Sequence, residues 1–261
     1  MTVTTHSDLA TDWAAWHAER EETLREPHGW LSLTALHWLD EHATAFPDLP
    51  GTWRATGDGG VEITADGELT VDGAPVRGTV RVAPVDGQPG VLVAAGERRV
   101  EVIRRTDSYA LRVRDPQAPT RTAFTGVPAF PVDARWVVTA RFTPYPQPQK
   151  ITVGAVVDGL QHFPTAVGTV AFELDGQRHQ LVALAGRDGG LALHFRDATS
   201  GDTTYGGGRI VQVPAPDAAG YVQLDLNRVV NLPCALTAYA TCPLPPEENR
   251  LSVAVEAGER S

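Results

Sequence analysis

The sequence predicts a mainly β protein, an antiparallel β barrel or sandwich with one or two helices near its N-terminal end. Short runs of β-branched and aromatic residues, separated by Gly, Asp and Pro, recur from residue 52 onward. The 261 residues include 25 Gly and 20 Pro, a composition that favours many turns over a helical bundle. At this length a β barrel or sandwich commonly forms one unit, so we expect a single domain over residues 1–261.

Residues 8–40 are expected to form an N-terminal helical segment that packs on the sheet. Apolar residues recur at helical spacing over residues 8–25, with Ser7 or Asp8 suited to cap the helix. A proline and a glycine end this helix, and the apolar run at residues 30–39 then predicts a second, short helix. We expect the tryptophans of this segment to lie in the core.

Residues 52–261 are expected to form a β-rich body that ends in a proline-rich motif loop. Alternating apolar runs bounded by turn residues indicate strands in a meander. The expected strands are 61–64, 69–71, 79–82, 91–94, 100–104, 109–113, 136–142, 151–157, 168–174, 180–183, 191–195, 222–226 and 251–255.

Composition excludes several classes of partner. The formal charge of −10 and the lack of a Lys/Arg cluster argue against nucleic acid. Neither a run of eighteen apolar residues nor a signal-peptide pattern is present, so no membrane partner and a cytoplasmic location are expected. The two cysteines are expected to be reduced thiols. A small molecule is the expected partner; the cofactor is unknown and a homo-oligomer is left open.

Residues 224–250 differ from the rest of the chain, because polar side chains crowd there beside four prolines. The four prolines lie between Pro233 and Pro246; since proline fixes φ and removes a backbone donor, we expect a stiff loop there and neither a helix nor a central strand. Stiff loops hold side chains in defined positions, so this segment is expected to carry the functional surface.

Several motifs resemble a known family. They are 29–33 (GWLSL), 141–146 (RFTPYP), 195–201 (FRDATSG), 204–209 (TYGGGR) and the segment 224–250. Together they resemble the bacterial domain of unknown function 1684 family from about Asp12 to Glu259. Where family members usually have Asn-Pro-Pro-Cys, this chain has Asn231-Leu232-Pro233-Cys234. The resemblance implies a boundary and a fold, but it implies no activity.

Three residues are candidates for catalysis. Cys234 could act as a nucleophile if a histidine from elsewhere activated it, or it could be a small buried apolar residue. Asp225 could line a polar cavity, or form an ion pair with Arg141, Arg209 or Arg250 that only fixes the loop. Glu248 offers a carboxylate for general acid/base chemistry. The spacing of Cys234 and Cys242 does not fit a zinc knuckle, so no metal site is predicted; a disulfide would require the loop to turn back on itself.

Seven further residues are candidates for ligand binding. Their side chains offer hydrogen bonds or positive charge from the motif loops, and they suit an anionic or aromatic small molecule. They are Arg141, Tyr145, Tyr205, Arg209, Asn227, Asn231 and Tyr239.

These residues predict a small-molecule pocket near the C-terminal motif. One hypothesis is a cofactor-independent hydrolase or acid/base enzyme, with Asp225, Asn227, Cys234, Tyr239 and Glu248 lining the cavity. The alternative is a non-catalytic small-ligand-binding β protein that uses the same cavity. A third reading makes the C-terminal motif a structural plug that closes the sheet.

Overall fold

The computed structural model describes residues 6–261, and these group into two compact units. The first unit comprises residues 6–21, 126–236 and 241–261; the second comprises residues 22–125 and 237–240. Each unit has its own hydrophobic core and its own seven-stranded antiparallel sheet. The expectation of a single domain stays a prediction.

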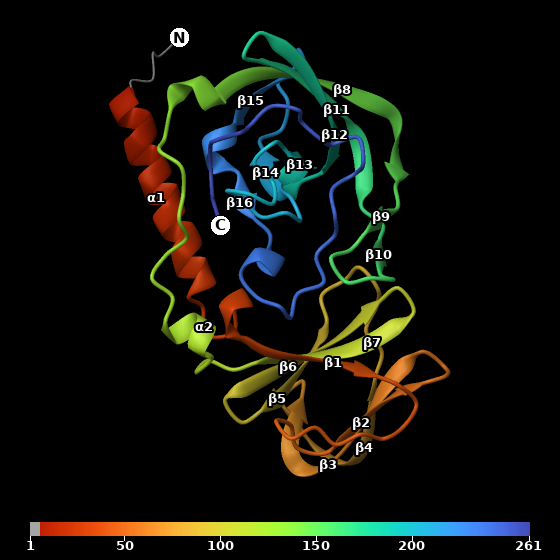
Figure 1. Ribbon diagram of the computed structural model, residues 1–261. Helices are drawn as coiled ribbons and strands as arrows, with labels where there is room; N and C mark the ends of the chain where they lie inside the picture. The colour runs from red at the N-terminus through yellow and green to blue at the C-terminus, as the bar shows by residue number, and fades with distance from the viewer. Residues whose placement is uncertain (1–5) are drawn as a thin grey trace. The chain divides into compact units, whose positions relative to one another are not determined.

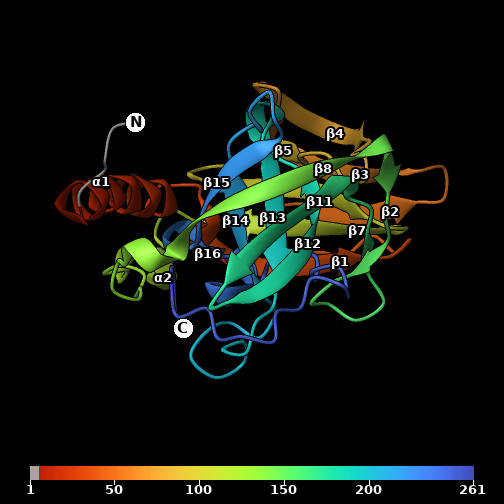
Figure 2. The same ribbon diagram turned by 90° about the horizontal axis from the view of Figure 1, so that it is seen from above.

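The sheet of the first unit has the strand order β15-β8-β11-β12-β13-β14-β16, with neighbours antiparallel. In Figure 1 the long strands β8, β11 and β12 curve round β13 and β14, and Figure 2 shows β8, β11 and β12 side by side. Trp136, Phe195 and Leu224 are fully buried in the core that this curvature encloses. The strands are β8 Val137–Lys150, β11 Thr165–Leu174, β12 Gln177–Ala185, β13 Leu191–Phe195, β14 Arg209–Val213, β15 Tyr221–Asp225 and β16 Val230–Asn231, with β9 Val153–Gly154 and β10 Gln161–His162 forming a separate pair.

The N-terminal helix α1, His6–Leu24, confirms the first predicted element. Trp13 Nε1 donates to the carbonyl of Asn227 at 2.7 Å, so the helix contacts residues more than two hundred positions away. Arg20 forms an ion pair with the fully buried Glu259, and its Nη2 lies 3.1 Å from a carboxylate oxygen of that residue. The side chain of Ser7, one of two expected caps, lies outside the described part of the structure.

The sheet of the second unit has the order β1-β7-β6-β5-β3-β2, with β4 paired to β3. Trp53, Val61 and Leu111 are among the fully buried residues of its core. The strands are β1 Leu33–Leu39, β2 Thr52–Thr56, β3 Gly60–Val71, β4 Ala74–Val82, β5 Val91–Ala95, β6 Arg98–Arg105 and β7 Ser108–Arg114. A short helix, α2 Pro119–Thr122, follows the sheet.

The second predicted helix, at residues 30–39, is wrong. Trp30–Ser32 forms one 3₁₀ turn, and Leu33–Leu39 is the edge strand β1, antiparallel to β7. A ten-residue apolar run cannot be assigned by periodicity alone, and here pairing with β7 satisfies the backbone of one strand edge. The helical part of the chain therefore ends earlier than expected.

The mainly β class is confirmed, and the strand limits differ in detail. The expected strands 61–64 and 69–71 are the two ends of one bent strand, β3, whose register shifts between Asp66 and Thr70. Residues 251–255 form no strand, and the expected strand at 151–157 is reduced to β9. Strands β2 and β14 were not predicted, because Arg54 and Gln212 interrupt their apolar pattern.

No helix within residues 6–261 is both long and apolar enough to cross a lipid bilayer.

Candidate functional site

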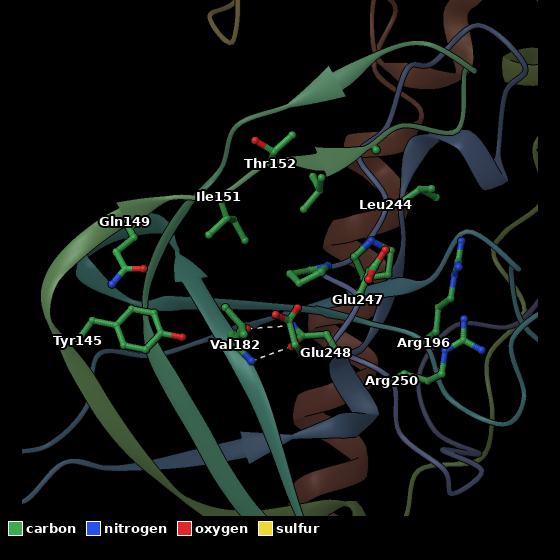
Figure 3. A pocket seen from close by; sticks show the side chains of 15 residues that line it. Tyr145, Gln149, Ile151, Thr152, Val182, Arg196, Leu244, Glu247, Glu248 and Arg250 are labelled. Carbon is green, nitrogen blue, oxygen red and sulfur yellow. Dashed lines mark hydrogen bonds between the residues drawn. The ribbon is translucent and has the colours of Figure 1, made fainter.

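A cavity of about 790 Å³ lies within the first unit. Its walls come from the end of β8, the β9 region and the segment 244–250, with single residues of β12 and of the loop after β13. The lining residues labelled in Figure 3 are Tyr145, Gln149, Ile151, Thr152, Val182, Arg196, Leu244, Glu247, Glu248 and Arg250. The expected stiff loop therefore forms one wall of a cavity.

Asn249 anchors that wall to the sheet. Its Oδ1 accepts from the amide of Val182 at 2.7 Å, and its Nδ2 donates to the carbonyls of Val182 and His194, both at 2.9 Å. Strands β12 and β13 pair only through the last two residues of β12 and the first two residues of β13. Their hydrogen-bond ladder therefore does not extend to Val182 and His194. The fully buried side chain of Asn249 occupies the gap and makes bonds that a neighbouring strand would otherwise make.

Arg196 and Arg250 form a cationic side of the cavity. The two residues are paired in a parallel bridge, in which Arg196 N donates to Asn249 O at 2.9 Å and Leu251 N donates to Arg196 O at 2.8 Å. This pairing points both guanidinium groups the same way, and Figure 3 shows them side by side. Within residues 6–261 neither arginine forms an ion pair, and the buried Nε of half-buried Arg196 has no hydrogen-bond partner.

The opposite side of the cavity is formed by Tyr145 and Gln149 of β8, as Figure 3 shows. Ile151 and Leu244 contribute apolar surface to the lining. Two exposed carboxylates, Glu247 and Glu248, belong to the same segment as the cationic side. The cavity therefore offers positive charge, carboxylates, a phenol and an apolar wall together.

His194 is buried behind this segment, at the end of β13, with 1% of its surface exposed. Burial lowers its pKa to about 4, against the effect of a hydrogen bond to the backbone of Gly207. A Cβ at Gly208, where φ is +94°, would lie 2.8 Å from the carbonyl oxygen of Phe195 and 3.3 Å from Nε2 of His194. Both the close contact and the positive φ explain the glycine at this position of the TYGGGR motif.

We expect the first unit to lose stability below neutral pH because of His194. Its pKa of about 4 lies below its ordinary value of 6.5, so the unfolded chain binds the proton more readily. The neutral ring's contribution is therefore present above pH 6.5 and lost as the pH falls towards 4, on the order of 3 kcal/mol in total. Urea unfolding at pH 7 and pH 5 should show a smaller loss for His194→Asn, which keeps a donor towards Gly207. Equal losses in the two proteins would contradict this role.

Tyr205 and the two cysteines lie together in the same unit. Burial raises the pKa of Tyr205, and negative charge on Cys234 and Cys242 raises it further. The positive charge of Arg196 lowers the same pKa. The phenol therefore lies within electrostatic range of both the cysteines and the cationic side of the cavity. Of the described residues, no group of three or more His, Cys, Asp or Glu is placed to hold a metal ion.

Several candidate residues do not line the cavity and instead form hydrogen bonds or ion pairs with other parts of the chain. Asp225 Oδ1 accepts from the amide of Asn227 at 3.0 Å and caps a 3₁₀ turn, and Asp225 pairs with Arg228 at 3.3 Å. The expected ion pair of Asp225 with Arg141, Arg209 or Arg250 is therefore wrong. Its true partner lies three residues further along the turn.

Asn227 and Asn231 are buried and bond to the backbone of distant residues. Asn227 exchanges two hydrogen bonds with the backbone of Asp133, at 3.0 and 3.1 Å. Asn231 donates from Nδ2 to the carbonyl of Arg260 at 3.0 Å, and its backbone amide donates to Glu259 at 2.7 Å. Both asparagines hold chain segments together.

Arg209 is fully buried and forms a 2.9 Å ion pair with Asp197. Burial lowers its pKa below the usual value, and the Asp197 carboxylate opposes that shift. Its Nη1 and Nη2 also bind the carbonyls of Val255, Ala257 and Glu259, at 2.8, 2.6 and 2.9 Å, whereas its buried Nε has no hydrogen-bond partner among the described residues. Arg209 therefore clamps the segment 255–259 inside the first unit.

Of the ten candidate residues, the cavity brings together only Tyr145 and Glu248. Arg141 is exposed with its guanidinium over the ring of Tyr221, and Tyr239 belongs to the residues grouped with the second unit. A catalytic role for Cys234, Asp225 or Glu248 stays a prediction. Sequence reasoning did not select Arg196, although the FRDATSG motif contains it.

The fold and the cavity define a mainly β protein built on two curled antiparallel sheets. Residues 122–260 match the family described as protein of unknown function (DUF1684), and the chain belongs to this family. The match begins later than the resemblance at Asp12 implied. Among solved structures, the chain is similar to an uncharacterised protein of Haloarcula marismortui determined by NMR in solution, with 34% identity, a TM-score of 0.45, and coverage of 54% of this chain and 79% of that one. A search of curated proteins found no match.

Proposed function

We propose that the first unit binds a small anionic molecule in the 790 Å³ cavity, with Arg196 and Arg250 as the groups that hold the negative charge. The observation that carries this proposal is the pair of arginines on one side of the cavity without a carboxylate partner in the described chain. Two like charges held side by side repel each other, and an anion between them removes that repulsion. Guanidinium groups also bind carboxylate and phosphate oxygens in a bidentate manner.

Two further features support a specific ligand over loose adsorption of anions. The chain carries a formal charge of −10, so most of its surface repels anions. Tyr145 and Gln149 offer hydrogen bonds on the side away from the arginines, and the apolar lining suits a ligand with a carbon skeleton. A cavity of this size falls within the range of small-molecule sites, about 300–1,000 Å³.

The binding hypothesis is favoured over the hydrolase or acid/base hypothesis by the position of the reactive groups. Only Glu248, of the three expected catalytic residues, lines the cavity. Asp225 accepts a hydrogen bond within its own turn, and Cys234 does not line the cavity. An acid/base reaction would therefore have to proceed through Glu248 with partners not expected from the sequence.

Thermal-shift titrations with anions test the proposal. We expect at least one of phosphate, sulfate, succinate and citrate to raise the melting temperature at constant ionic strength, because a ligand that binds only the folded state stabilises it. Arg196→Gln and Arg250→Gln should each weaken the apparent affinity about tenfold or more, since a charged hydrogen bond contributes about 1.5–3 kcal/mol.

Arg178→Gln provides the matched control, because Arg178 is an exposed arginine of the neighbouring strand β12 and does not line the cavity. Its removal changes the net charge equally and should leave the titration unchanged. The proposal fails if no anion of the panel stabilises the protein more than chloride does, or if all three variants lose affinity equally.

A further inference from the structure

Cys234 and Cys242 form a reciprocal pair of hydrogen bonds. The amide of Cys234 donates to Sγ of Cys242 with an N···S distance of 3.3 Å, and the amide of Cys242 donates to Sγ of Cys234 at 3.1 Å. Each sulfur therefore lies on the side of its residue that faces the other cysteine. The two residues carry separate thiols in this structure.

This geometry brings the two thiols within reach of each other. A disulfide requires Cα atoms less than about 7 Å apart and side chains that converge. Each sulfur lies one hydrogen-bond length from an amide nitrogen, and that nitrogen is about 1.5 Å from the Cα of the other cysteine. Because each sulfur points at the opposite residue, rotation of the side chains is the main movement that bonding requires.

We propose that Cys234 and Cys242 are a site of reversible disulfide formation, with a low-molecular-weight disulfide such as oxidised glutathione as the oxidant. The thiolate of one cysteine attacks a sulfur of glutathione disulfide and releases one glutathione thiol. The thiolate of the second cysteine then attacks this mixed disulfide and releases the other glutathione. Two electrons pass from the protein to glutathione disulfide, and the two cysteine protons end on the released thiols.

The exposure of the two cysteines indicates which thiol reacts first with the external disulfide. Cys234 is half-buried, whereas Cys242 is only 7% exposed. Cys234 is therefore the thiol that an external disulfide reaches, and Cys242 is the resolving thiol.

The disulfide would constrain the base of the cavity wall. The carbonyl of Cys242 accepts from the amide of Val156 at 3.0 Å, and Leu244 N donates to Gly154 O at 2.8 Å. Residues 244–250 continue directly into the wall. A bond from Cys242 to the 3₁₀ turn Pro233–Ala235 would therefore tie that turn to the segment that leads into the wall.

Thiol counting in glutathione redox buffers tests this proposal on the full chain. After incubation with oxidised glutathione, wild-type protein should lose both maleimide-reactive thiols under denaturing conditions and lose the mass of two hydrogen atoms. Dithiothreitol should restore both thiols. The melting temperature should be higher in the oxidised form, because the cross-link constrains the unfolded chain.

Two serine variants separate the steps. Cys242→Ser should accumulate one glutathione adduct at Cys234, because the resolving thiol is missing, while Cys234→Ser should keep its buried thiol. The proposal is overturned if wild-type protein retains two reactive thiols, or if it ends as a stable glutathione adduct without the intramolecular bond. Equally fast glutathione addition to both serine variants would overturn the assigned order of attack.

Discussion

Replacing Arg209 by methionine is expected to lower the stability of the first unit more than any single surface substitution. The variant leaves the carboxylate of Asp197 buried without its cation and removes the donors to the carbonyls of Val255, Ala257 and Glu259. Breaking one partner of a buried ion pair costs about 3–5 kcal/mol. Thermal unfolding followed by circular dichroism should show a fall of about 10 °C in the melting temperature of the first unit.

Arg178→Met is the matched control for this substitution, because Arg178 is exposed on β12 and should change stability by no more than about 0.5 kcal/mol. Adding Asp197→Asn to Arg209→Met removes the uncompensated charge, so the double variant should be less destabilised than the sum of the two single changes. A clamp role for Arg209 is refuted if its loss costs no more than the loss of Arg178.

Replacing Asn249 by alanine is expected to destabilise the cavity wall and the sheet together. The change leaves the amide and carbonyl of Val182 and the carbonyl of His194 without the partner that now satisfies them. Unsatisfied buried groups cost about 1–3 kcal/mol each, so a loss of about 3 kcal/mol in the free energy of unfolding is expected. Hydrogen exchange should reveal the change directly, as faster exchange of the Val182 amide.

Asn249→Asp sharpens this test because the aspartate has nearly the same shape. It keeps an acceptor for the Val182 amide, but it places a carboxylate oxygen against the two carbonyls that Nδ2 now contacts. We expect this variant to be less stable than Asn249→Ala, since a buried unpaired charge is more costly than a missing bond. Glu248→Ala, an exposed neighbour in the same segment, serves as control. If Asn249→Asp were as stable as that control, Asn249 could not be bridging the sheet.

The helix, strands and loop whose structure depends on the residues close to them in the sequence were predictable. Helix α1 follows from apolar spacing, most strands follow from alternation, and the loop after Pro233 follows from its prolines. The error at residues 30–39 arose because the strand forms only by pairing with β7, more than seventy residues later for most of its length. No local signal in a short apolar run reports such a pairing.

The candidate site was predictable in its segment but not in its residues. Asn249 acts on the backbone of residues 67 and 55 positions away, and Arg196 lies beside Arg250 through a parallel bridge between residues 54 positions apart. Asn227 and Arg209 stood out in the sequence because they are polar residues in motifs, yet their contacts hold chain segments together. Which polar residues face a cavity depends on long-range pairing, and spacing in the sequence does not report it.

The clamp on residues 255–259 also determines the order in which the two units can fold during synthesis. All seven strands of the second sheet lie between Leu33 and Arg114, so its core can form on the ribosome soon after they emerge. Glu259 is the partner of Arg20 and supplies one of the carbonyls that Arg209 binds, so the first unit cannot complete these contacts until residue 259 has been synthesised. Helix α1 therefore emerges before every strand of both sheets but is among the last elements to reach its final contacts.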